Sequence, residues 1–571
     1  MNSRQIDINT LGNVISTDVL VIGGGCGGLV AALKAKESNS SLDVCIVDKA
    51  NVGFAGQAPR AGNGLMGFKD GTDLDKYMEY HVENIGKYLN DQNMLREVTN
   101  INRESLKQLL KWGVLVTTDE KGKLGFFDHP AGHWQNLGVD LNMTNTLKKQ
   151  AIKLGVKIKN NIQITELLKD GERVVGALGF NLLDGSFYIF KAKAVILSTA
   201  GCGFRSIRMF NGRGEGIKLA WDAGAQMRNA EFGNFFEVVS AQMGESIYGT
   251  QKFIYNQDGE NLWDKYVKWN SPDVCPELVL GMEKEIREGH GPLYVDMDKM
   301  DEAWKVVGPE SAKLGNLTRL FPDKLKWMKR LNEREHMYFD LGTKPEVKVG
   351  LHGNTGCIRV DLDMLSTVKG LYAIGVDCWN GSAMAGAVPL PGLQRGNGLM
   401  HAITTGMIGG PSAAKYAENV VQGNISIEDV EKAKIKTYAS LNRNNGVDVR
   451  PVIRELQNIV CQVKYNLRRS EKNLLEGIKK LKEIKTLLDT VKVEDFHGLM
   501  LYHETKAMIQ TAELIFTSAL ERKESRGFHF REDYPETDNN NWLKWVVADN
   551  KNGKIVVSTE NIPINEYRIK P

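Results

Sequence analysis

Residues 18–50, DVLVIGGGCGGLVAALKAKESNSSLDVCIVDKA, decide the fold. Residues 19–22 are a short apolar run suited to a buried parallel strand, and residues 29–36 are good helix formers. A second apolar run follows at residues 44–47. Strand, helix and strand in this order predict a βαβ unit, and therefore an α/β fold built on a parallel sheet.

Three glycines join the first strand to the helix in the pattern G-x-G-x-x-G. Gly23 permits a tight turn, Gly25 lets a pyrophosphate approach the backbone, and Gly28 lets the helix pack on the strand. The free N–H groups at the helix start favour an anion. Asp48, at the end of the second run, is placed to accept both ribose hydroxyls. We therefore predict a site for an adenine dinucleotide with a free 2′-hydroxyl.

The same glycine pattern recurs at Gly62, Gly64 and Gly67. No strand precedes this second match, and no acid follows it at the right distance. We expect it to be a flexible loop.

Composition limits the class of protein. A chain of 571 residues is too long for one hydrophobic core, so about two to four domains are expected. A net charge of +3 gives no reason to expect nucleic acid or a membrane surface as partner. There is no secretory leader pattern and no apolar run long enough to span a bilayer, which predicts a cytoplasmic protein.

No metal site is predicted. The seven cysteines include no CxxC pair, so neither a zinc site nor a cysteine-ligated cluster is expected. His129 and His133 are four residues apart, but Pro130 and Gly132 argue against a helical metal pair.

Three later segments have the features of a cofactor site. Residues 167–203 predict hairpin strands and then a buried strand, which ends in the small residues Thr199, Ala200 and Gly201. Residues 370–377 repeat the strand-to-acid pattern and end at Asp377. Residues 396–410 predict a helix of small residues directly after a glycine turn, which would direct its positive end at an anionic flavin ring.

These four segments, in this order, resemble the flavoprotein subunit family of fumarate reductase, succinate dehydrogenase, L-aspartate oxidase and adenylylsulfate reductase. The resemblance covers essentially the whole chain and extends to residues 285–297, 350–358 and 519–545. The motifs IVDKA, GHWQ and GPLYVDM are most similar to the adenylylsulfate reductase alpha branch. Residues 375–392 lack the histidine-rich segment of that branch, so the chain is a divergent relative.

The family implies a discontinuous Rossmann-type FAD-binding domain, over residues 1–232 and 350–425. It also implies an inserted α+β capping domain at 233–349 and a C-terminal helical domain with a tail at 426–571. The sequence supports the helical domain independently. Apolar residues recur at spacings of three and four, a stripe more typical of a bundle core than of a partner interface: Leu474, Ile478, Leu481, Ile484 and Leu488.

The resemblance also assigns FAD contacts, residue by residue. Glu215 stands where the family usually has Gly-Asp-Gly, and Asp377 is one residue past the expected acid, because Val376 takes that place. The full set of predicted FAD-binding residues is Gly23, Gly25, Gly28, Asp48, Lys49, Gly56, Gln57, Thr199, Ala200, Gly201, Glu215, Asp377, Gly398 and Leu399.

Relatives that act on succinate and fumarate usually tether FAD to a histidine soon after the ribose acid. No histidine occurs here between Asp48 and Tyr80, so FAD is predicted to bind non-covalently. An untethered flavin normally has a lower potential, which disfavours succinate oxidation.

The substrate side departs further from the dicarboxylate enzymes. Phe236, Cys275 and Leu393 stand where the family has a histidine and two arginines. Of the family's anchors only His352 keeps its place, while Arg395 lies two residues beyond Leu393. The candidate catalytic residues are therefore His352, Arg395 and Arg60, the last in the loop expected to pass the flavin. The alternative for His352 is a loop histidine bonded to the backbone. The alternative for Arg395 is a structural ion pair at a helix start.

Two further residue sets have structural interpretations. Cys26 lies in the phosphate turn, where a helix start lowers a thiol pKa, but filling space beside the pyrophosphate is the favoured role. His529 and Arg531 are expected to brace the helical domain against the FAD domain.

The resulting hypothesis is an FAD-dependent oxidoreductase that transfers hydride between flavin N5 and a small polar or anionic substrate. A separate iron–sulfur or ferredoxin-type protein would exchange the electrons, which implies a hetero-oligomer. The alternatives are an adenylylsulfate reductase-like subunit, a fumarate reductase or succinate dehydrogenase-like subunit, and a non-catalytic subunit that relays electrons in a larger complex.

Overall fold

The structure is a computed structural model. It describes residues 7–61, 64–119, 121–128, 132–207, 212–233, 236–241, 244, 251–268, 276–296, 298–299, 344–353, 355–384 and 396–571. Within these ranges, no helix is long and apolar enough to cross a membrane.

A seven-stranded sheet forms the centre of the molecule. Its path is β6-β2-β1-β9-β8-β7, and β15 pairs with the end of β9. Strands β6, β2, β1, β9 and β15 run parallel, whereas β7 and β8 run antiparallel to their neighbours. The bounds are β1 Asn13–Ile22, β2 Val44–Val47, β6 Lys157–Lys159, β7 Ile162–Asp170, β8 Arg173–Asn181, β9 Phe187–Leu197 and β15 Leu371–Ala373. The predicted α/β class and both apolar strands are confirmed.

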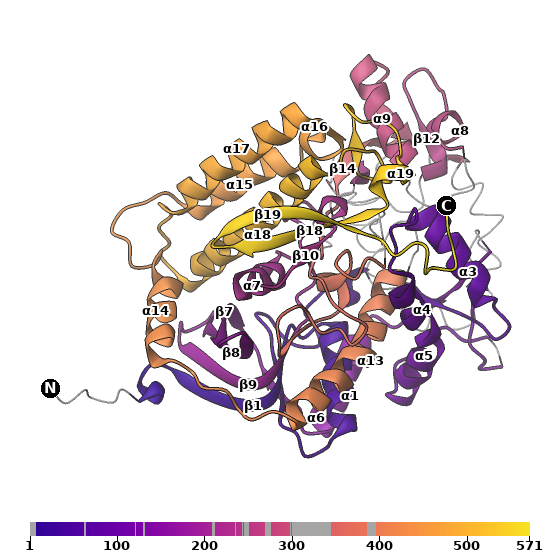
Figure 1. The fold of residues 1–571 in the computed structure, drawn as a ribbon. Helices are drawn as coiled ribbons and strands as arrows, with labels where there is room; N and C mark the ends of the chain where they lie inside the picture. Colours follow the sequence, from indigo (N-terminus) through magenta and orange to yellow (C-terminus); the bar gives the residue numbers. More distant parts are fainter. Residues whose placement is uncertain are drawn as a thin grey trace, which may run out of the picture.

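Helices cover the sheet (Figure 1). The bounds are α1 Cys26–Ser38, α6 Met143–Lys153, α7 Glu215–Ala223 and α13 Asn397–Glu418. Helices α1 and α13 pack on each other and on β1, while α7 packs on β7. The predicted small-residue helix after a glycine turn is α13, which follows Gly396 in the left-handed region, with φ +80°.

Small residues let α1 and α13 approach closely. A Cβ built on Gly406 would lie 2.8 Å from the carbonyl oxygen of Gly27, and one on Gly410 would lie 2.3 Å from that of Ala31. Larger side chains would therefore separate the two helices. This contact fixes where α13 begins relative to the first strand.

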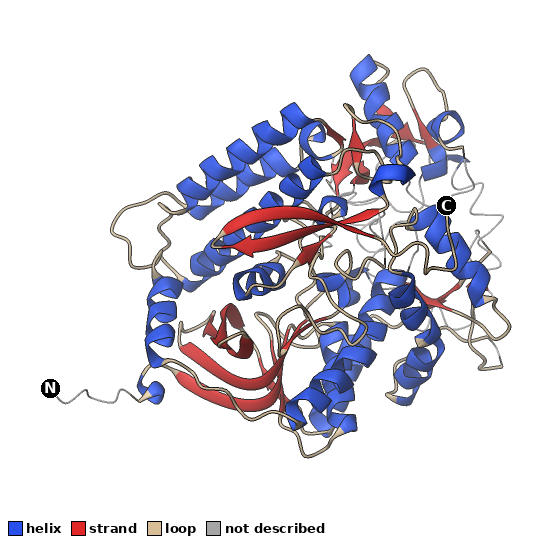
Figure 2. Cartoon of the chain, viewed as in Figure 1, coloured by secondary structure: helices blue, strands red, loops and turns tan. Residues whose placement is uncertain are grey.

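A smaller unit is inserted between residues 236 and 351. Its four strands lie in the order β11-β14-β13-β12, with bounds β11 Phe236–Ser240, β12 Ile254–Tyr255, β13 Leu293–Val295 and β14 Glu346–Leu351. Helices α8 Leu262–Tyr266 and α9 Pro276–Glu288 accompany them at one end of the molecule (Figure 2). Because β11 and β14 pair antiparallel, the chain enters and leaves this unit side by side.

The C-terminal part is mainly helical: α14 Ile427–Tyr438, α15 Val449–Val460, α16 Val463–Asn466, α17 Glu471–Leu488 and α18 Phe496–Glu521. Helix α17 packs on α15 and α18, and it buries Leu474, Leu481, Ile484 and Leu488 and partly buries Ile478, as the periodicity predicts. A hairpin, β18 Lys544–Lys551 and β19 Lys554–Asn561, contacts α18 and pairs with β10 Met227–Arg228.

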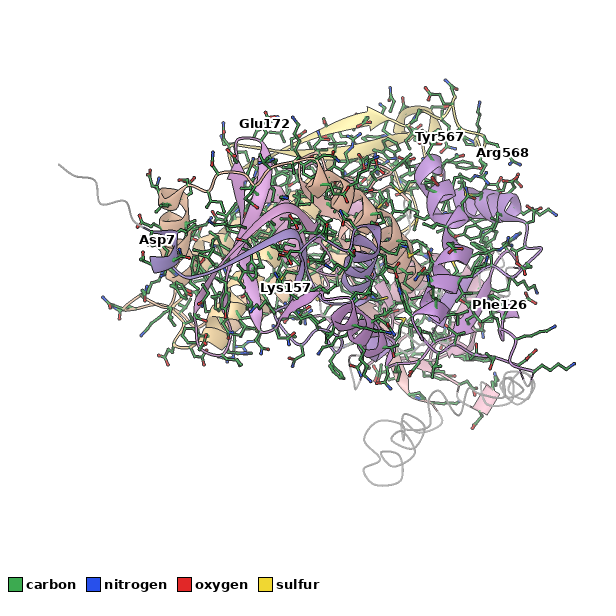
Figure 3. The ribbon with its side chains drawn as sticks, turned by 90° about the horizontal axis from the view of Figure 1, so that it is seen from below. Asp7, Phe126, Lys157, Glu172, Tyr567 and Arg568 are labelled. Atoms are coloured by element: carbon green, nitrogen blue, oxygen red, sulfur yellow. The ribbon has the colours of Figure 1, made fainter. Side chains whose placement is uncertain are left out.

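The chain termini lie at opposite ends of the molecule (Figure 3). Asp7 lies at one end, and Tyr567 and Arg568 lie at the other, where Arg568 pairs with Asp75 at 2.7 Å. The remaining elements are η1 Ile8–Thr10, α2 Ala58–Ala61, β3 Gly64–Gly67, α3 Leu74–Tyr80, the π-helix η2 His81–Ile85, α4 Gln92–Asn100, α5 Asn102–Lys111, β4 Phe127–Asp128, β5 Gln135–Gly138, η3 Ala230–Phe232, η4 Gln251–Phe253, η5 Gly375–Cys378, β16 Arg468–Arg469, β17 Phe530–Arg531 and α19 Asn539–Trp542.

One local expectation was wrong. Residues 64–67, which we expected to be a flexible loop, form strand β3 and pair with β5. The N–H of Met66 also donates to the carbonyl of Gly396 at 3.2 Å. Residues 64–67 form a strand because they pair with residues that are distant in the sequence. A local glycine pattern cannot predict such pairing.

The α1–α13 contact predicts a stability effect. Gly410→Ala places a methyl group against a backbone oxygen that cannot turn aside, so we expect a loss of about 1–3 kcal/mol in the free energy of unfolding. Urea unfolding measures it. Lys415→Ala, on the exposed side of the same helix, is the control. Equal stability of the two variants would contradict the close contact.

Candidate functional site

The carboxyl ends of the parallel strands bring the predicted cofactor motifs together. Ile22, Val47 and Leu197 are the last residues of three neighbouring strands, and they align in register across β2, β1 and β9. Ala373, at the end of β15, pairs with Leu197. Ligands of open α/β sheets bind in the crevice outside such strand ends.

The glycine turn has the geometry that a pyrophosphate requires. Gly23 has φ +106°, and a Cβ there would lie 2.1 Å from the carbonyl oxygen of Ser198. A Cβ on Gly28 would lie 2.0 Å from the carbonyl oxygen of Gly23, so helix α1 is held tightly to the strand. At Gly25, the N-cap of α1, nothing lies within 4 Å of the added atom. This open face at a helix start is where an anionic group fits.

Asp48 lies directly after β2 and faces the turn. Its Oδ2 accepts a hydrogen bond from the N–H of Gly24 at 2.6 Å, and its Oδ1 accepts one from Ala50 at 2.6 Å. Each carboxylate oxygen can accept a further hydrogen bond. The position and chemistry of Asp48 therefore suit ribose hydroxyls beside the glycine turn.

Thr199, Ala200 and Gly201 form a strained turn after β9. Ala200 and Gly201 both lie in the left-handed region, with φ +74° and +63°. The N–H of Thr199 donates to Oδ2 of Asp377, its hydroxyl donates to Oδ1 at 3.0 Å, and the N–H of Gly201 donates to Oδ1 at 3.3 Å. Asp377 thus ties the turn after β9 to the turn after β15.

Asp377 is fully buried. Burial raises its pKa to about 6, because the hydrogen bonds from Thr199 and Gly201 offset only part of the cost of desolvating the charge. The sequence singled out this acid for a cofactor contact. In the structure its carboxylate is directed at the protein backbone, which makes it a support for the cofactor turn.

Lys49 and Glu215 belong to one partly buried charge cluster around Glu504. The Lys49 ammonium contacts Glu215 and lies 2.7 Å from Glu504 on α18. Arg205 also contacts Glu504, and Arg213 lies 3.9 Å from it. Burial by itself would lower the pKa of Lys49, but the two carboxylates leave it raised. The cluster therefore connects the end of β2 with the C-terminal helices.

The remaining predicted FAD-binding residues lie along the same edge. Gly56 has φ +84°, and a Cβ there would lie 3.4 Å from Cα of Gly25, so the loop containing Gly56 and Gln57 passes beside the glycine turn. Gly398 and Leu399 are in the first turn of α13, and nothing lies within 4 Å of a Cβ on Gly398. Two helix starts with open glycine faces thus meet one strand edge, which fits a long dinucleotide.

His352 lies in the loop after β14 and is fully buried. Its Nδ1 is 2.7 Å from Oε1 of Glu237 on β11, a side chain that is 1% exposed. The next residue, Gly353, packs on the loop that follows the turn of Thr199–Gly201, since its Cβ would lie 3.1 Å from Cα of Gly203. The buried pair therefore lies between the inserted unit and the cofactor edge.

The other two catalytic candidates, Arg395 and the side chain of Arg60, lie outside the described part of the chain. Cys275 and Leu393, which stand where the resemblance predicts arginines, also lie outside it. Phe236 is described and fully buried in β11, where it pairs with Leu351. The resemblance predicts a histidine at this position in dicarboxylate enzymes, and the structure places an apolar ring there.

Comparison with known sequences decides the family. The model for the FAD binding domain matches residues 18–394, and the model for the fumarate reductase flavoprotein C-terminal region matches residues 453–571. The chain belongs to the fumarate reductase and succinate dehydrogenase flavoprotein family. The predicted family is confirmed, and the protein is an FAD-dependent oxidoreductase.

Relatives span the whole length of this flavoprotein. The 8-methylmenaquinol:fumarate reductase flavoprotein subunit of Wolinella succinogenes is 26% identical over 100% of this chain and 94% of its own. The fumarate reductase flavoprotein subunit of Haemophilus influenzae is 25% identical over 94% of this chain and 93% of its own.

Solved structures share the fold. A quinol fumarate reductase chain from E. coli aligns with a TM-score of 0.81 at 18% identity, over 98% of this chain and 99% of its own. Adenylylsulfate reductase from Archaeoglobus fulgidus aligns with a TM-score of 0.74 at 21% identity, over 98% and 97%.

The sequence missed several residues of the site. Glu237 is a single acid in an apolar strand, and only its position beside a strand end signals a partner. Glu504 and Arg205 are far apart in sequence and meet only through the fold. For Cys26, burial raises the thiol pKa to about 12, so the helix start does not activate it.

The predicted brace exists and includes His529, whose ring lies edge-on to that of Phe232 with centroids 5.8 Å apart. Two arginines share the brace: Arg469 donates to the carbonyl of Glu231 at 2.8 Å, and Arg522 pairs with the Glu231 carboxylate at 2.8 Å. Arg531 instead bonds within the C-terminal part, where it donates to the carbonyl of Arg522 at 3.1 Å and so helps to position that arginine.

The buried Asp377 predicts a pH-dependent stability. Its folded pKa of about 6 lies above the usual value of 3.8, so the folded chain retains a proton that the unfolded chain releases. As pH rises from about 4 to about 7, we expect the wild-type protein to lose up to about 3 kcal/mol relative to Asp377→Asn. Urea unfolding across this range measures the difference. A difference that does not change with pH would contradict the buried charge.

Proposed function

We propose that this flavoprotein reduces a small anionic organic substrate by hydride transfer from bound, untethered FAD. The residues proposed to hold FAD are those along the strand edge, from Gly23 and Asp48 to Gly398. The substrate would lie between this edge and the inserted unit. The proposal depends chiefly on one observation, the buried pair of Glu237 and His352 at that boundary.

A buried ionisable pair usually adds little to the free energy of unfolding. Removing two polar groups from water is costly, and apolar side chains of similar volume are often as stable. Functional sites are where such pairs concentrate. Glu237 and His352 lie on the two chain segments that enter and leave the inserted unit, so the pair lies at the junction of the two parts.

The geometry suggests a role for each side chain. The Glu237 carboxylate can hold the proton on Nδ1 of His352, which fixes the tautomer and the orientation of the ring. Proton exchange with a substrate would then take place at Nε2.

The electrons are proposed to come from a separate iron–sulfur protein. Within the described residues, no group of three or more His, Cys, Asp or Glu side chains could hold a metal ion. The relatives of Wolinella and Haemophilus are named as flavoprotein subunits. A hetero-oligomer is the assembly that this proposal implies.

Two alternatives have specific support. A fumarate or succinate enzyme is favoured by the names of the relatives and disfavoured by Phe236. An adenylylsulfate reductase-like reaction is favoured by the shared fold and by the motifs IVDKA and GPLYVDM. A relay subunit without substrate would account for the lost anchors, but it gives no reason to bury Glu237 beside His352.

The first experiment identifies the acceptor. FAD is reduced anaerobically in the purified protein, and its reoxidation is followed after mixing with fumarate, adenylylsulfate and a panel of other enoates. We expect one acceptor other than fumarate to react at enzymatic rates, with fumarate at least about 100-fold slower because Phe236 offers no cation. Fast reoxidation by fumarate would contradict our interpretation of Phe236, and no reoxidation by any acceptor would favour the relay.

The same preparation tests whether FAD is bound covalently. Acid precipitation should leave the yellow pigment in solution. Pigment that stays with the polypeptide would contradict non-covalent binding.

The role of Glu237 is tested by substitution. Glu237→Gln keeps the shape and one hydrogen bond but removes the carboxylate that orients His352. With the acceptor identified above, we expect kcat to fall about 100-fold and its pH dependence to change, with FAD affinity unchanged.

The control is Glu285→Gln, a buried glutamate on α9 of the same inserted unit that bonds Asn256 and Tyr266. It should leave kcat and the pH profile unchanged. If Glu237→Gln behaves like the control, Glu237 is not a positioning residue for the reaction.

A further inference from the structure

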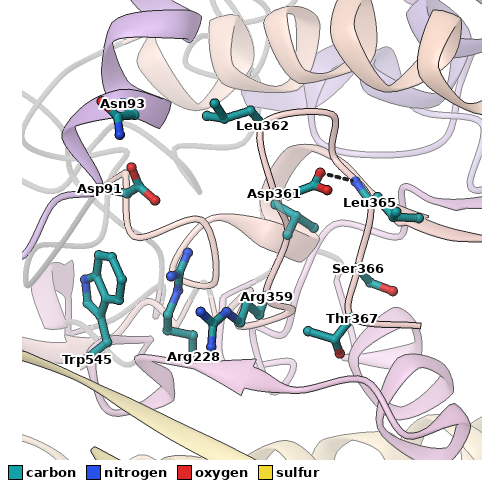
Figure 4. Close-up of a pocket in the computed structure, with 11 residues that line it drawn as sticks. Asp91, Asn93, Arg228, Arg359, Asp361, Leu362, Leu365, Ser366, Thr367 and Trp545 are labelled. Atoms are coloured by element: carbon teal, nitrogen blue, oxygen red, sulfur yellow. Dashed lines mark hydrogen bonds between the residues drawn. The ribbon is translucent and has the colours of Figure 1, made fainter. Parts of the chain in front are cut away.

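A polar cavity lies between the FAD-binding part and the C-terminal hairpin, and none of the FAD-binding motifs lines it (Figure 4). Its volume is about 430 Å³, within the range of small-molecule sites. Four segments line it: the start of α4, strand β10, residues 359–367 and β18. Arg228, Val360, Ser366 and Trp545 make a buried floor, while Asn93, Asp361 and Leu362 form an exposed rim.

Arg228 is the exceptional residue of this cavity. It is 3% exposed, its guanidinium lies 4.3 Å from the centre of the Trp545 ring, and its Nε donates to the carbonyl of Gly381 at 2.7 Å. Among the described residues, no carboxylate lies within ion-pair distance of it. Burial lowers its pKa to about 10, although it remains a cation at neutral pH. A buried guanidinium without a counter-ion is unfavourable unless something else supplies the anion.

The nearest carboxylates, Asp91 and Glu560, favour the Arg228 cation only at longer range and form no ion pair with it. Arg359, also on the cavity wall, has its own partner, because it pairs with both oxygens of Glu560 at 2.7 and 3.0 Å. Asp91 is the N-cap of α4, where its Oδ1 accepts from Met94 at 3.2 Å. In Figure 4 the Arg228 side chain extends from the floor towards Asp91, but no ion pair joins these two lining residues.

The cavity is therefore lined by a cation and an anion that form no ion pair with each other. A ligand that carries a carboxylate and an ammonium on adjacent atoms would match both charges. A simple carboxylate would meet Arg228 but place an apolar group against Asp91, and a dicarboxylate would place a second anion there. Val360, Leu362 and Leu365 offer apolar wall for a side chain.

We propose that this cavity binds a free α-amino acid, with its carboxylate on Arg228 and its ammonium on Asp91. The site shares no lining residue with the FAD motifs, so it is separate from the proposed substrate site. Arg228 bonds Gly381, which lies on the segment between Asp377 and α13.

Binding is tested on the full-length, FAD-loaded protein. Thermal unfolding is measured with each of the protein L-amino acids in turn, and calorimetric titration gives the affinity of every one that stabilises the protein. The best binder is then compared with its analogue lacking the amino group and its analogue lacking the carboxylate. We expect each analogue to bind at least about tenfold more weakly, the scale of one charge-assisted hydrogen bond.

Asp91→Asn is the decisive variant, because asparagine also caps helices and α4 should remain intact. We expect this substitution to lower the affinity for the amino acid at least about tenfold. The affinity for the analogue without the amino group should stay the same. Asp73→Asn is the control, since Asp73 caps the neighbouring helix α3 in the same way outside the cavity. Arg228→Gln should lower the affinity for the amino acid and for the analogue without the amino group by similar factors.

Three results would each overturn the proposal. They are the absence of any stabilising amino acid, equal binding by the analogue without the amino group, and unchanged affinity in Asp91→Asn. None depends on enzyme turnover, so the outcome is independent of the proposed reaction.

Discussion

Close backbone contact that only glycine permits is the constraint on which the structure depends. At the end of β1, Gly23 lies against Ser198, and Gly28 lies against Gly23. On the helix side, Gly406 and Gly410 let α13 lie against α1. Together these contacts bring two helix starts to one edge of the parallel sheet, and a long anionic cofactor needs both. The fold is therefore organised around a surface that a Cβ at any of these positions would disturb.

Buried charge is the second organising feature, and it has a different role at each place. Around Glu504, carboxylates and cations from three parts of the chain meet and join the C-terminal helices to the sheet. Asp377 is buried with backbone donors and supports a strained turn. Glu237 and His352 form a pair between the sheet edge and the inserted unit. At Arg228 the charge has no counter-ion among the described residues, which is why we assign a ligand there.

The family and the reaction class follow from different observations. The matched domains and the full-length relatives show an FAD-dependent oxidoreductase, and the strand-edge geometry fits that cofactor. Substrate choice depends on only a few side chains, and the proposed substrate region here contains a buried Phe236 and a buried pair of Glu237 and His352. A shared fold with altered anchors is the pattern expected when one scaffold serves several substrates.

The sequence by itself determined the parallel strands, the glycine turn, Asp48 and the helical stripe of α17. These depend on residues close together in the chain, where periodicity and turn chemistry act directly. It did not determine strand β3, the partner of Lys49, the orientation of Asp377 or the pairing of Glu237 with His352. Each of these depends on burial or on contacts between residues that are more than sixty positions apart in the chain. The local sequence does not indicate which distant group will pack against a side chain and exclude water from it. Tertiary structure alone decided those contacts, because desolvation and ion pairing depend on distance in space.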